Sequence, residues 1–213
     1  MGLPVIDSYP MPDRSALPAS SPSWTIDPAR AALLVHDMQN HYVQAFPAGS
    51  SPVVELIDNI TTLRELAGTL GMPVVFSAEP VPEPDAASIV PQLTPRAGEH
   101  LLVNVRHNAF LRSHLGRLLR STGRDQLILC GVRAHLGILL TAADAFMHDI
   151  QPFVVADAVA DFSAEDHSMA LRWIARTGVV CTTNQLLREL LHSRAAHDTS
   201  ATVRPVHEQR RPG

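Results

Sequence analysis

Short apolar runs alternate with stretches of helical periodicity over most of this chain, and this alternation restricts its fold more than any other feature. The run AALLVHD at 31–37 is apolar until it ends in polar residues, as is typical of a strand buried on both faces of a parallel sheet. The stretch at 51–71 then has apolar residues at helical spacing and ends at Gly71. Repeated units of this kind predict an α/β fold, with a parallel sheet and helices on both faces.

The other predicted elements continue this order. Strands are expected at 31–37, 72–79, 99–106, 125–132, 151–159 and 179–183, and helices at 51–71, 108–123, 134–149, 163–178 and 184–193. Asn108 is a plausible N-cap for the second helix, and Ser163 with Asp166 forms a capping box at the start of the fourth. No internal repeat is visible in the chain.

The two ends of the chain differ from this central part in composition. Residues 1–24 are rich in proline and serine, which excludes a helix and predicts an arm, either lying along the body or loose. Residues 194–213 are polar and mildly basic, which predicts a disordered tail with solvated charges, or alternatively a partner contact. We therefore expect an arm at 1–24, one domain at 25–193 and a tail at 194–213.

Charge and cysteine content argue against several classes of protein. The net charge of −4 gives no electrostatic reason to bind nucleic acid or an anionic membrane, and no window is long and apolar enough to span a membrane. Cys130 and Cys181 end apolar runs, so we expect two buried thiols and a reducing cytoplasm; the N-terminus does not resemble a signal peptide. A nucleotide cofactor has no support, because the chain contains neither GxGxxG nor a P-loop.

Two carboxylates are expected at the C-terminal ends of strands, where ligands of such folds bind. Asp37 follows the first strand, and partial burial there would favour its protonated form and suit it to proton transfer. The alternative is a carboxylate that caps the next turn or pairs with an arginine. Glu79 follows the second strand, and if the strands are adjacent the two carboxylates interact. Its alternative is a surface glutamate before Pro80.

The stretch GVRAHLG at 131–137 joins the fourth strand to an apolar helix. A helix N-terminus offers unpaired N–H groups to an anion, Arg133 could bind a carboxylate, and His135 could carry a proton. The alternatives are a surface charge for Arg133 and a satisfied histidine at a helix start for His135. Cys130 ends an apolar run just before this stretch, which favours an inert core thiol over a nucleophile.

The blocks LLVHDMQ and GRDQLILCGVRAHLGILLTAADAFMHDIQPFVVADAVADFSAEDHSMAL, in this order and spacing, resemble the isochorismatase family. The arm, with IDSYPMP, fits the phenazine- and siderophore-pathway members, and the resemblance covers residues 1–192. It implies a six-stranded, mostly parallel sheet between helical layers, no organic cofactor, and a homodimer or larger homo-oligomer.

The chemistry implied by the resemblance is cleavage of the enol ether of isochorismate, or of its amino analogue, to a dihydroaromatic acid and pyruvate. An aspartate that matches Asp37 protonates the vinyl carbon, water attacks the oxocarbenium ion, and the hemiketal collapses. Gly137 stands where cysteine hydrolases of the wider superfamily carry their nucleophile. The stretch SAEPVPEP lacks the metal-binding Asp-x-His of nicotinamidases, so we expect no metal.

Three residues depart from the pattern of the resembled family. Asn104 stands at the place of an active-site lysine, Glu79 at that of a glutamine, and Arg133 at that of a tyrosine. The family residues carry about +1 in total at neutral pH and these three about 0. The connection between the second and third strands, which in phenazine-type enzymes covers the pocket, is also much shorter, whereas Arg106 and Gly137 are retained.

These features lead to one main hypothesis and two alternatives. The main hypothesis is a divergent isochorismatase-like hydrolase of secondary metabolism that acts on a small polar or anionic substrate. Its predicted catalytic residues are Asp37, Asn104 and Glu79, and its predicted substrate-binding residues are Arg133, Arg106, Gly137 and His135. The alternatives are a catalytically impaired binding or scaffold subunit, and a non-hydrolytic enzyme that performs a step such as a cyclisation.

Overall fold

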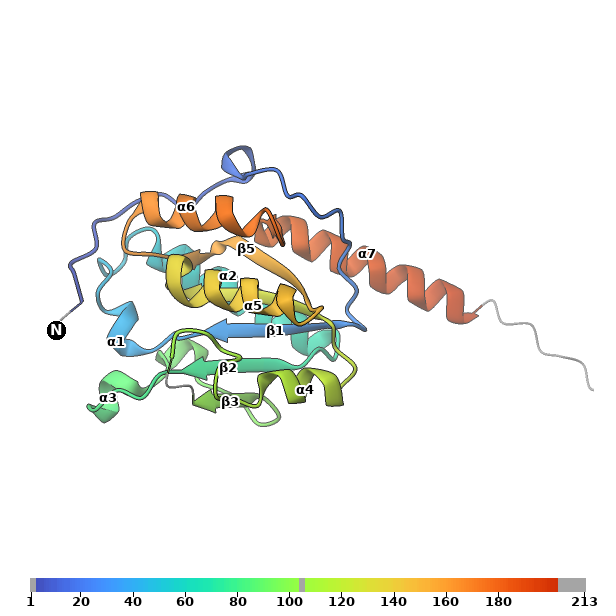
Figure 1. Ribbon diagram of the computed structural model, residues 1–213, viewed down its shortest axis with the longest axis horizontal. Helices are drawn as coiled ribbons and strands as arrows, with labels where there is room; N and C mark the ends of the chain where they lie inside the picture. The colour runs from blue at the N-terminus through green and yellow to red at the C-terminus, as the bar shows by residue number, and fades with distance from the viewer. Residues whose placement is uncertain (1–2, 104–105, 203–213) are drawn as a thin grey trace, which may run out of the picture.

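The computed structural model of the protein describes residues 3–103 and 106–202. Six parallel strands form one sheet in the order β3-β2-β1-β4-β5-β6 (Figure 1). The strands are β1 Ala31–His36, β2 Val74–Ala78, β3 His100–Val103, β4 Gln126–Val132, β5 Gln151–Ala160 and β6 Val179–Cys181. The predicted α/β class and the parallel sheet are therefore confirmed.

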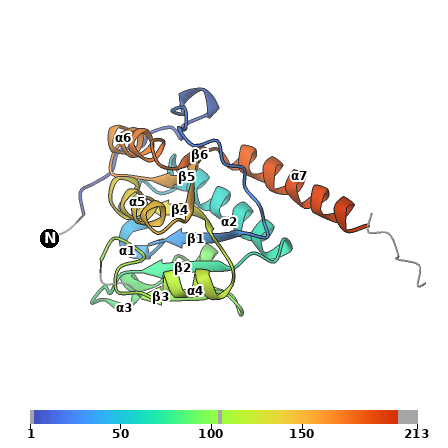
Figure 2. The ribbon, with the colours of Figure 1, turned by 45° about the vertical axis from the view of Figure 1, so that its right-hand side comes forward.

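Helices cover both faces of this sheet (Figure 2). The main helices are α2 Val53–Thr69, α4 Leu115–Ser121, α5 Leu139–Met147, α6 Ala164–Ile174 and α7 Thr183–Thr202. The shorter ones are η1 Arg14–Ala16, α1 Asn40–Val43, α3 Pro84–Ala87, η2 Pro91–Leu93 and the π-helical turn η3 Ala134–Ile138. None of the helices in 3–103 and 106–202 is long and apolar enough to cross a membrane.

The core has two halves, because successive side chains of a strand point to opposite faces of the sheet. Leu33 and Val35 of β1 pack in one cluster with residues of α2 and α7. Ala32 and Leu34 pack in the other with residues of α4, α5 and α6. All six residues of β1 are buried, which is why this strand reads as a continuous apolar run.

The helix boundaries differ from the sequence prediction at several points, and two of them by more than five residues. The helix expected from 108 begins at Leu115, and Asn108 is not its N-cap; the Asn108 side chain instead accepts a hydrogen bond from the backbone N–H of Phe110. Asparagine readily forms such local turns, which compete with helix formation. The next helix opens with the π turn η3, and the last helix continues to Thr202, beyond its expected end at 193. Residues 203–213 of the predicted tail lie outside the described residues.

The N-terminal arm lies along the body, which decides between the two options that the sequence left open (Figure 1). Ile6 and Tyr9 are buried. The Tyr9 hydroxyl accepts a hydrogen bond from the backbone N–H of Asp161 at 2.8 Å. Farther along, the Ser20 hydroxyl accepts from the N–H of Val180 at 2.9 Å. The arm thus contributes to the core and is fixed at both of these points.

The strand order places one edge of β1 beside β2 and the other beside β4. His36, the last residue of β1, is opposite Ser77 of β2 and Gly131 of β4. The connections from β1 and β4 run to opposite sides of the sheet here, and ligands of open α/β sheets bind in the crevice at such a point. The fold therefore brings the residues that follow β1, β2 and β4 to one place.

Candidate active site

Asp37 is the first residue after β1, and its side chain is completely buried. Its backbone has φ of 49°, a left-handed conformation that few non-glycine residues adopt. Ser77 donates a hydrogen bond to Oδ1 of Asp37 at 3.2 Å, whereas Oδ2 has no hydrogen-bond partner. The turn thus holds a carboxyl group in the interior with one oxygen available for chemistry.

His36 lies beside this oxygen and is also completely buried. Its Nδ1 is 3.2 Å from Oδ2 of Asp37, but the two atoms are outside hydrogen-bond geometry. Its Nε2 is 2.8 Å from the carbonyl oxygen of His107, which can only accept, so Nε2 carries a proton. Burial by itself lowers the pKa of His36, but Asp37, the His107 carbonyl and Glu79 together outweigh burial and raise it.

Two glycines permit this close packing around His36. A Cβ atom at Gly131 would lie 2.1 Å from the backbone oxygen of His36, and one at Gly137 would lie 2.6 Å from the His36 ring. Gly137, a predicted substrate-binding residue, therefore borders the buried His36–Asp37 pair. A cysteine nucleophile at position 137 would collide with the imidazole in its present position.

Glu79 is the centre of a second group of side chains at the same edge. Its Oε1 is 2.6 Å from Nδ1 of His107, and its Oε2 accepts a hydrogen bond from the hydroxyl of Tyr42 and lies 3.4 Å from Nη2 of Arg133. The Arg133 guanidinium also stacks on the Tyr42 ring, with 4.5 Å between the guanidinium carbon and the ring centre. Burial, followed by the hydrogen bond to Glu79, raises the pKa of Tyr42. Glu79 is thus mostly buried and paired, at variance with its alternative as a surface residue.

The segment that follows β2 is fastened over this edge by Gln39. The Gln39 side chain donates hydrogen bonds to the carbonyl oxygens of Glu79 and Ala87, each at 2.8 Å, and accepts one from the N–H of Glu79. Gln39 also forms an antiparallel bridge with Ile89. The short connection between β2 and β3 is therefore bound to the residues just after Asp37.

The other predicted residues lie at different places. His135 contacts Asp161 and Phe162. Its Nδ1 is 2.7 Å from Oδ1 of Asp161, and its backbone N–H donates a hydrogen bond to Oδ2 of Asp161 at 2.5 Å. Arg106 is exposed. Asn104 lies outside the described residues. The structure thus brings Asp37, Glu79, Arg133 and Gly137 together and connects His135 to a different carboxylate.

Four residues that line this edge received no role from the sequence, although the rule of ligand binding beyond strand ends placed His36 there. They are His36, Gln39, Tyr42 and His107. Three of them fall within eight residues of one another around Asp37, so a polar cluster just after a buried strand was the available signal. His107 carried no such signal, because only the return of the chain after β3 brings it to Glu79.

The two cysteines have the buried positions that the sequence predicted. The thiols of Cys130 and Cys181 are enclosed in the core, and burial raises the pKa of both. A thiol that is hard to ionise is a poor nucleophile. Within 3–103 and 106–202, no three His, Cys, Asp or Glu residues gather as a set of metal ligands.

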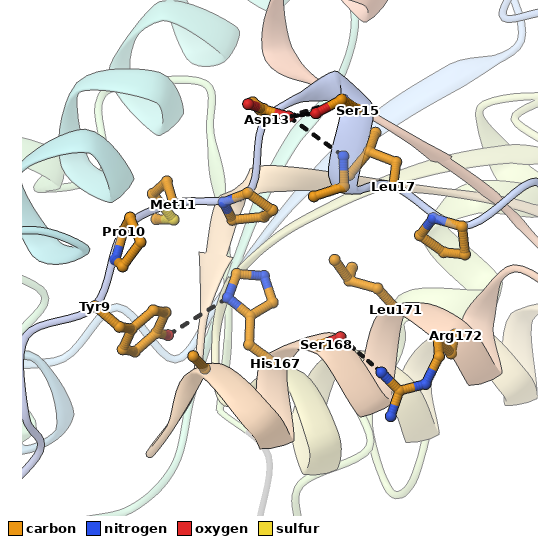
Figure 3. Close-up of a pocket in the computed structure, with 14 residues that line it drawn as sticks. Tyr9, Pro10, Met11, Asp13, Ser15, Leu17, His167, Ser168, Leu171 and Arg172 are labelled. Atoms are coloured by element: carbon orange, nitrogen blue, oxygen red, sulfur yellow. Dashed lines mark hydrogen bonds between the residues drawn. The ribbon is translucent and has the colours of Figure 1, made fainter.

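A cavity of about 600 Å³ lies elsewhere, between the N-terminal arm and α6 (Figure 3). The Tyr9 hydroxyl lies 3.4 Å from Nδ1 of His167 at its edge, and Nε2 of His167 is 3.0 Å from the carbonyl oxygen of Ala156. Burial lowers the pKa of His167 to about 4, so this imidazole is neutral at pH 7. None of the predicted site residues lines this cavity.

The chemistry open to the residues around Asp37 follows from their buried polar atoms that lack hydrogen-bond partners. Six buried side-chain polar atoms among the described residues lack a hydrogen-bond partner, and three of them, His36 Nδ1, Asp37 Oδ2 and Arg133 Nε, lie at this edge. Buried polar atoms are nearly always paired, and exceptions often mark functional sites. A buried carboxyl group with one unpaired oxygen beside a histidine can deliver or take up a proton.

Comparisons of the sequence with a family model and with known proteins all point to the same family. The model of the isochorismatase domain matches residues 31–185. The chain is 42% identical over 224 residues to an isochorismatase of Bacillus subtilis, covering 95% of this chain and 72% of that one. It is 39% identical to a phenazine biosynthesis protein, PhzD, of Pseudomonas fluorescens, covering 87% and 99% of the two chains. It is 38% identical to enterobactin synthase component B of Escherichia coli, covering 88% and 73%.

Solved structures show the same fold at lower identity. An isochorismatase from Pseudomonas putida superposes with a TM-score of 0.72 at 23% identity, over 80% of this chain and all of that one. A cysteine hydrolase from Pseudomonas syringae superposes with a TM-score of 0.74 at 21% identity, over 83% and 98%.

Proposed function

This chain belongs to the isochorismatase family of hydrolases, and from that premise we propose that it hydrolyses an enol ether with Asp37 as the acid. The observation that carries the proposal is the Asp37 carboxyl group, which is completely buried and has one unpaired oxygen. The similar proteins include an isochorismatase, a phenazine biosynthesis protein and a component of enterobactin synthase, which supports a role in secondary metabolism.

The proposed reaction begins with transfer of a proton from Asp37 to the terminal vinyl carbon of the substrate. The ether carbon becomes an oxocarbenium ion, which water attacks. The Asp37 carboxylate takes up the proton that the water loses and is restored to its acid form. The resulting hemiketal then collapses to a keto acid and an alcohol, so that one water is consumed and one C–O bond is broken.

His36 serves as a positioning residue for this proton. Because Nε2 of His36 already donates to the His107 carbonyl, Nδ1 faces Asp37 either as a lone pair or as an N–H group. A neutral imidazole presents a lone pair, which favours the acid form of Asp37; an imidazolium presents a proton, which stabilises the carboxylate left after proton transfer. The buried pair is therefore suited to both halves of the cycle.

The substrate would contact the residues that surround this pair. We assign binding roles to Arg133 and Gly137, which border Glu79 and His36 respectively. The roles of Asn104 and Arg106 in contacting substrate remain proposals that rest on their positions just after β3. His135 would affect substrate binding indirectly, through the contacts that it makes with Asp161.

The direct test is Asp37→Asn, which keeps the shape of the side chain and removes its proton. Isochorismate, its 2-amino analogue and the two monoamides of isochorismate are incubated with the protein, and keto products are measured by chromatography. We expect Asp37→Asn to lower kcat by about 10³-fold, because general acid catalysis contributes about 10²–10⁴-fold. Asp58→Asn, at an exposed position on α2, is the matched control and should retain activity.

Two results would contradict the proposal. One is full turnover by Asp37→Asn with circular dichroism that matches the wild type. The other is the absence of keto product from all four enol ethers with the wild-type protein, which would favour a binding subunit or a different reaction.

A further inference from the structure

Arg133 follows β4 at the same sheet edge as the proposed acid, and its charge is already compensated within the protein. Its Nη2 lies 3.4 Å from Oε2 of Glu79, and only 9% of the Arg133 side chain and 14% of that of Glu79 are exposed. Ion pairs shielded from water are weakened little by salt or solvent. An incoming carboxylate would therefore have to compete with Glu79 for the same guanidinium.

The remaining contacts of Arg133 leave it little freedom to turn toward an anion. One face of the guanidinium lies on the Tyr42 ring, and Nη2 is also 2.9 Å from Nδ1 of His107. Tyr42 and His107 in turn contact Glu79, so the four side chains fix one another. Turning Arg133 away from Glu79 would break the stacking contact as well as the ion pair.

One donor of Arg133 is still unused. Its Nε is buried and has no hydrogen-bond partner among the described residues. A single buried N–H beside a compensated charge suits a neutral acceptor, such as a hydroxyl, carbonyl or amide oxygen. A carboxylate placed there would also lie next to Glu79, and two close carboxylates repel each other strongly where water is excluded.

We infer that Glu79 occupies at Arg133 the position that a substrate carboxylate would take, and that the pair therefore selects an enol ether with a neutral acceptor at that point. This inference rests on the proposed enol-ether hydrolysis and names its substrate class. Glu79 is in this view a specificity-determining residue. Asp37, and not Glu79, donates the proton in the proposed reaction.

Stable aryl analogues test the inference through binding alone. The probes are 3-(1-carboxyethoxy)benzoate, a dicarboxylate whose saturated ether has no vinyl carbon to protonate, and its two monoamides, in which one carboxylate at a time becomes a neutral carboxamide. Kd is measured by calorimetry for wild-type protein and for Glu79→Gln. We expect Glu79→Gln to improve binding of the dicarboxylate relative to one monoamide by about tenfold, because Arg133 is then free to pair with that carboxylate. The monoamide whose Kd ratio to the dicarboxylate changes shows which of the two carboxylates contacts Arg133.

Two variants serve as controls. Glu65→Gln removes the same charge from another Glu–Arg pair, that of Glu65 with Arg96 on the surface, and should leave the ratio of Kd values unchanged. Glu79→Gln combined with Arg133→Gln removes the cation as well and should abolish the gain.

The inference is overturned if Glu79→Gln changes neither of the two Kd ratios, that of the dicarboxylate to each monoamide, by more than twofold. If the wild type does not bind the dicarboxylate, the inference is overturned when Glu79→Gln does not bind it either. It is also overturned if Glu65→Gln produces the same gain. These results leave the role of Asp37 intact, because that role is judged by product release. Conversely, a gain in binding by Glu79→Gln together with full activity of Asp37→Asn would retain the charge selection and reject the proposed reaction.

Discussion

Two buried polar groups lie at the C-terminal ends of strands in this protein, and they differ in how completely they are satisfied. The Asp37 cluster consists of His36, Asp37, Glu79 and Arg133, at the ends of β1, β2 and β4. The Asp161 network consists of Tyr9, His135, Asp161 and His167, and it joins the end of β5 to the arm, η3 and α6.

In the Asp161 network every side-chain polar atom that is buried has a partner. The Asp161 carboxylate accepts from the N–H groups of His135 and Phe162 and contacts the His135 ring. Burial raises the pKa of Asp161, although these contacts oppose the rise. The Asp37 cluster contains three unpaired buried atoms instead. A satisfied network stabilises a fold, whereas unpaired atoms cost stability and are retained where chemistry needs them.

The largest expected effect that tests this comparison is on stability. Asp161→Ala should lower the free energy of unfolding by about 4 kcal/mol, because it leaves the buried donors of His135 and Phe162 without an acceptor. Asp37→Asn should change it by less than about 1 kcal/mol, because Oδ2 of Asp37 makes no hydrogen bond to lose. Urea unfolding followed by circular dichroism measures both, and equal losses would remove the distinction between the two groups.

An intermediate effect is expected from pH, through His167. Its pKa is lowered from 6.5 to about 4, so the unfolded chain binds more protons than the folded protein between these values. Stability should therefore fall as pH decreases, by about 2 kcal/mol between pH 7 and pH 5 from this residue alone. His36, whose pKa is raised, changes stability in the opposite direction over the same range.

Comparison with His167→Gln isolates this contribution, because the variant keeps a polar side chain that does not titrate. Urea unfolding of both proteins at pH 7 and pH 5 should show the wild type losing about 2 kcal/mol more than the variant. Parallel losses in the two proteins would mean that His167 is not held neutral by burial.

The smallest effect is expected at the point where the arm joins the network. Tyr9→Phe removes the hydroxyl that accepts from the N–H of Asp161 and should cost about 1–2 kcal/mol. Thermal melts and protease digestion measure the loss and show whether the arm is released. Because the arm lies apart from the Asp37 cluster, kcat at 25 °C should change less than twofold; a large fall would show that the two groups are coupled.

Much of the fold followed from local patterns in the sequence. Each strand is a short apolar run, and every strand except β3, in which Leu101 and Val103 are exposed, is largely buried on both faces. The six predicted strands match β1 to β6 in order. Strand boundaries differ by no more than two residues, apart from the end of the third strand, where residues 104–105 lie outside the described residues. The largest helix errors are at the end of α7 and at the start of α4, where the Asn108 side chain bonds a nearby N–H and delays the helix. Local chemistry of this kind is hard to weigh without knowing the competing contacts.

The candidate site was predicted only in part. The rule that ligands bind beyond strand ends selected Asp37, Glu79 and Arg133, because each of them directly follows a strand. It did not show that Glu79 and Arg133, which are 54 positions apart in the chain, form a pair. It also grouped His135 with them, although the turn of η3 directs its contacts to Asp161.

The sequence by itself determined the α/β class, the order of the elements and the position of Asp37 at the end of the first strand. These depend on hydrophobic periodicity, which neighbouring residues define. Only the tertiary structure decided which polar groups meet: His36 with Asp37 and the His107 carbonyl, and Glu79 with Arg133, Tyr42 and His107. Such contacts depend on the register of strands and on the satisfaction of buried hydrogen bonds, and both are properties of the folded chain as a whole.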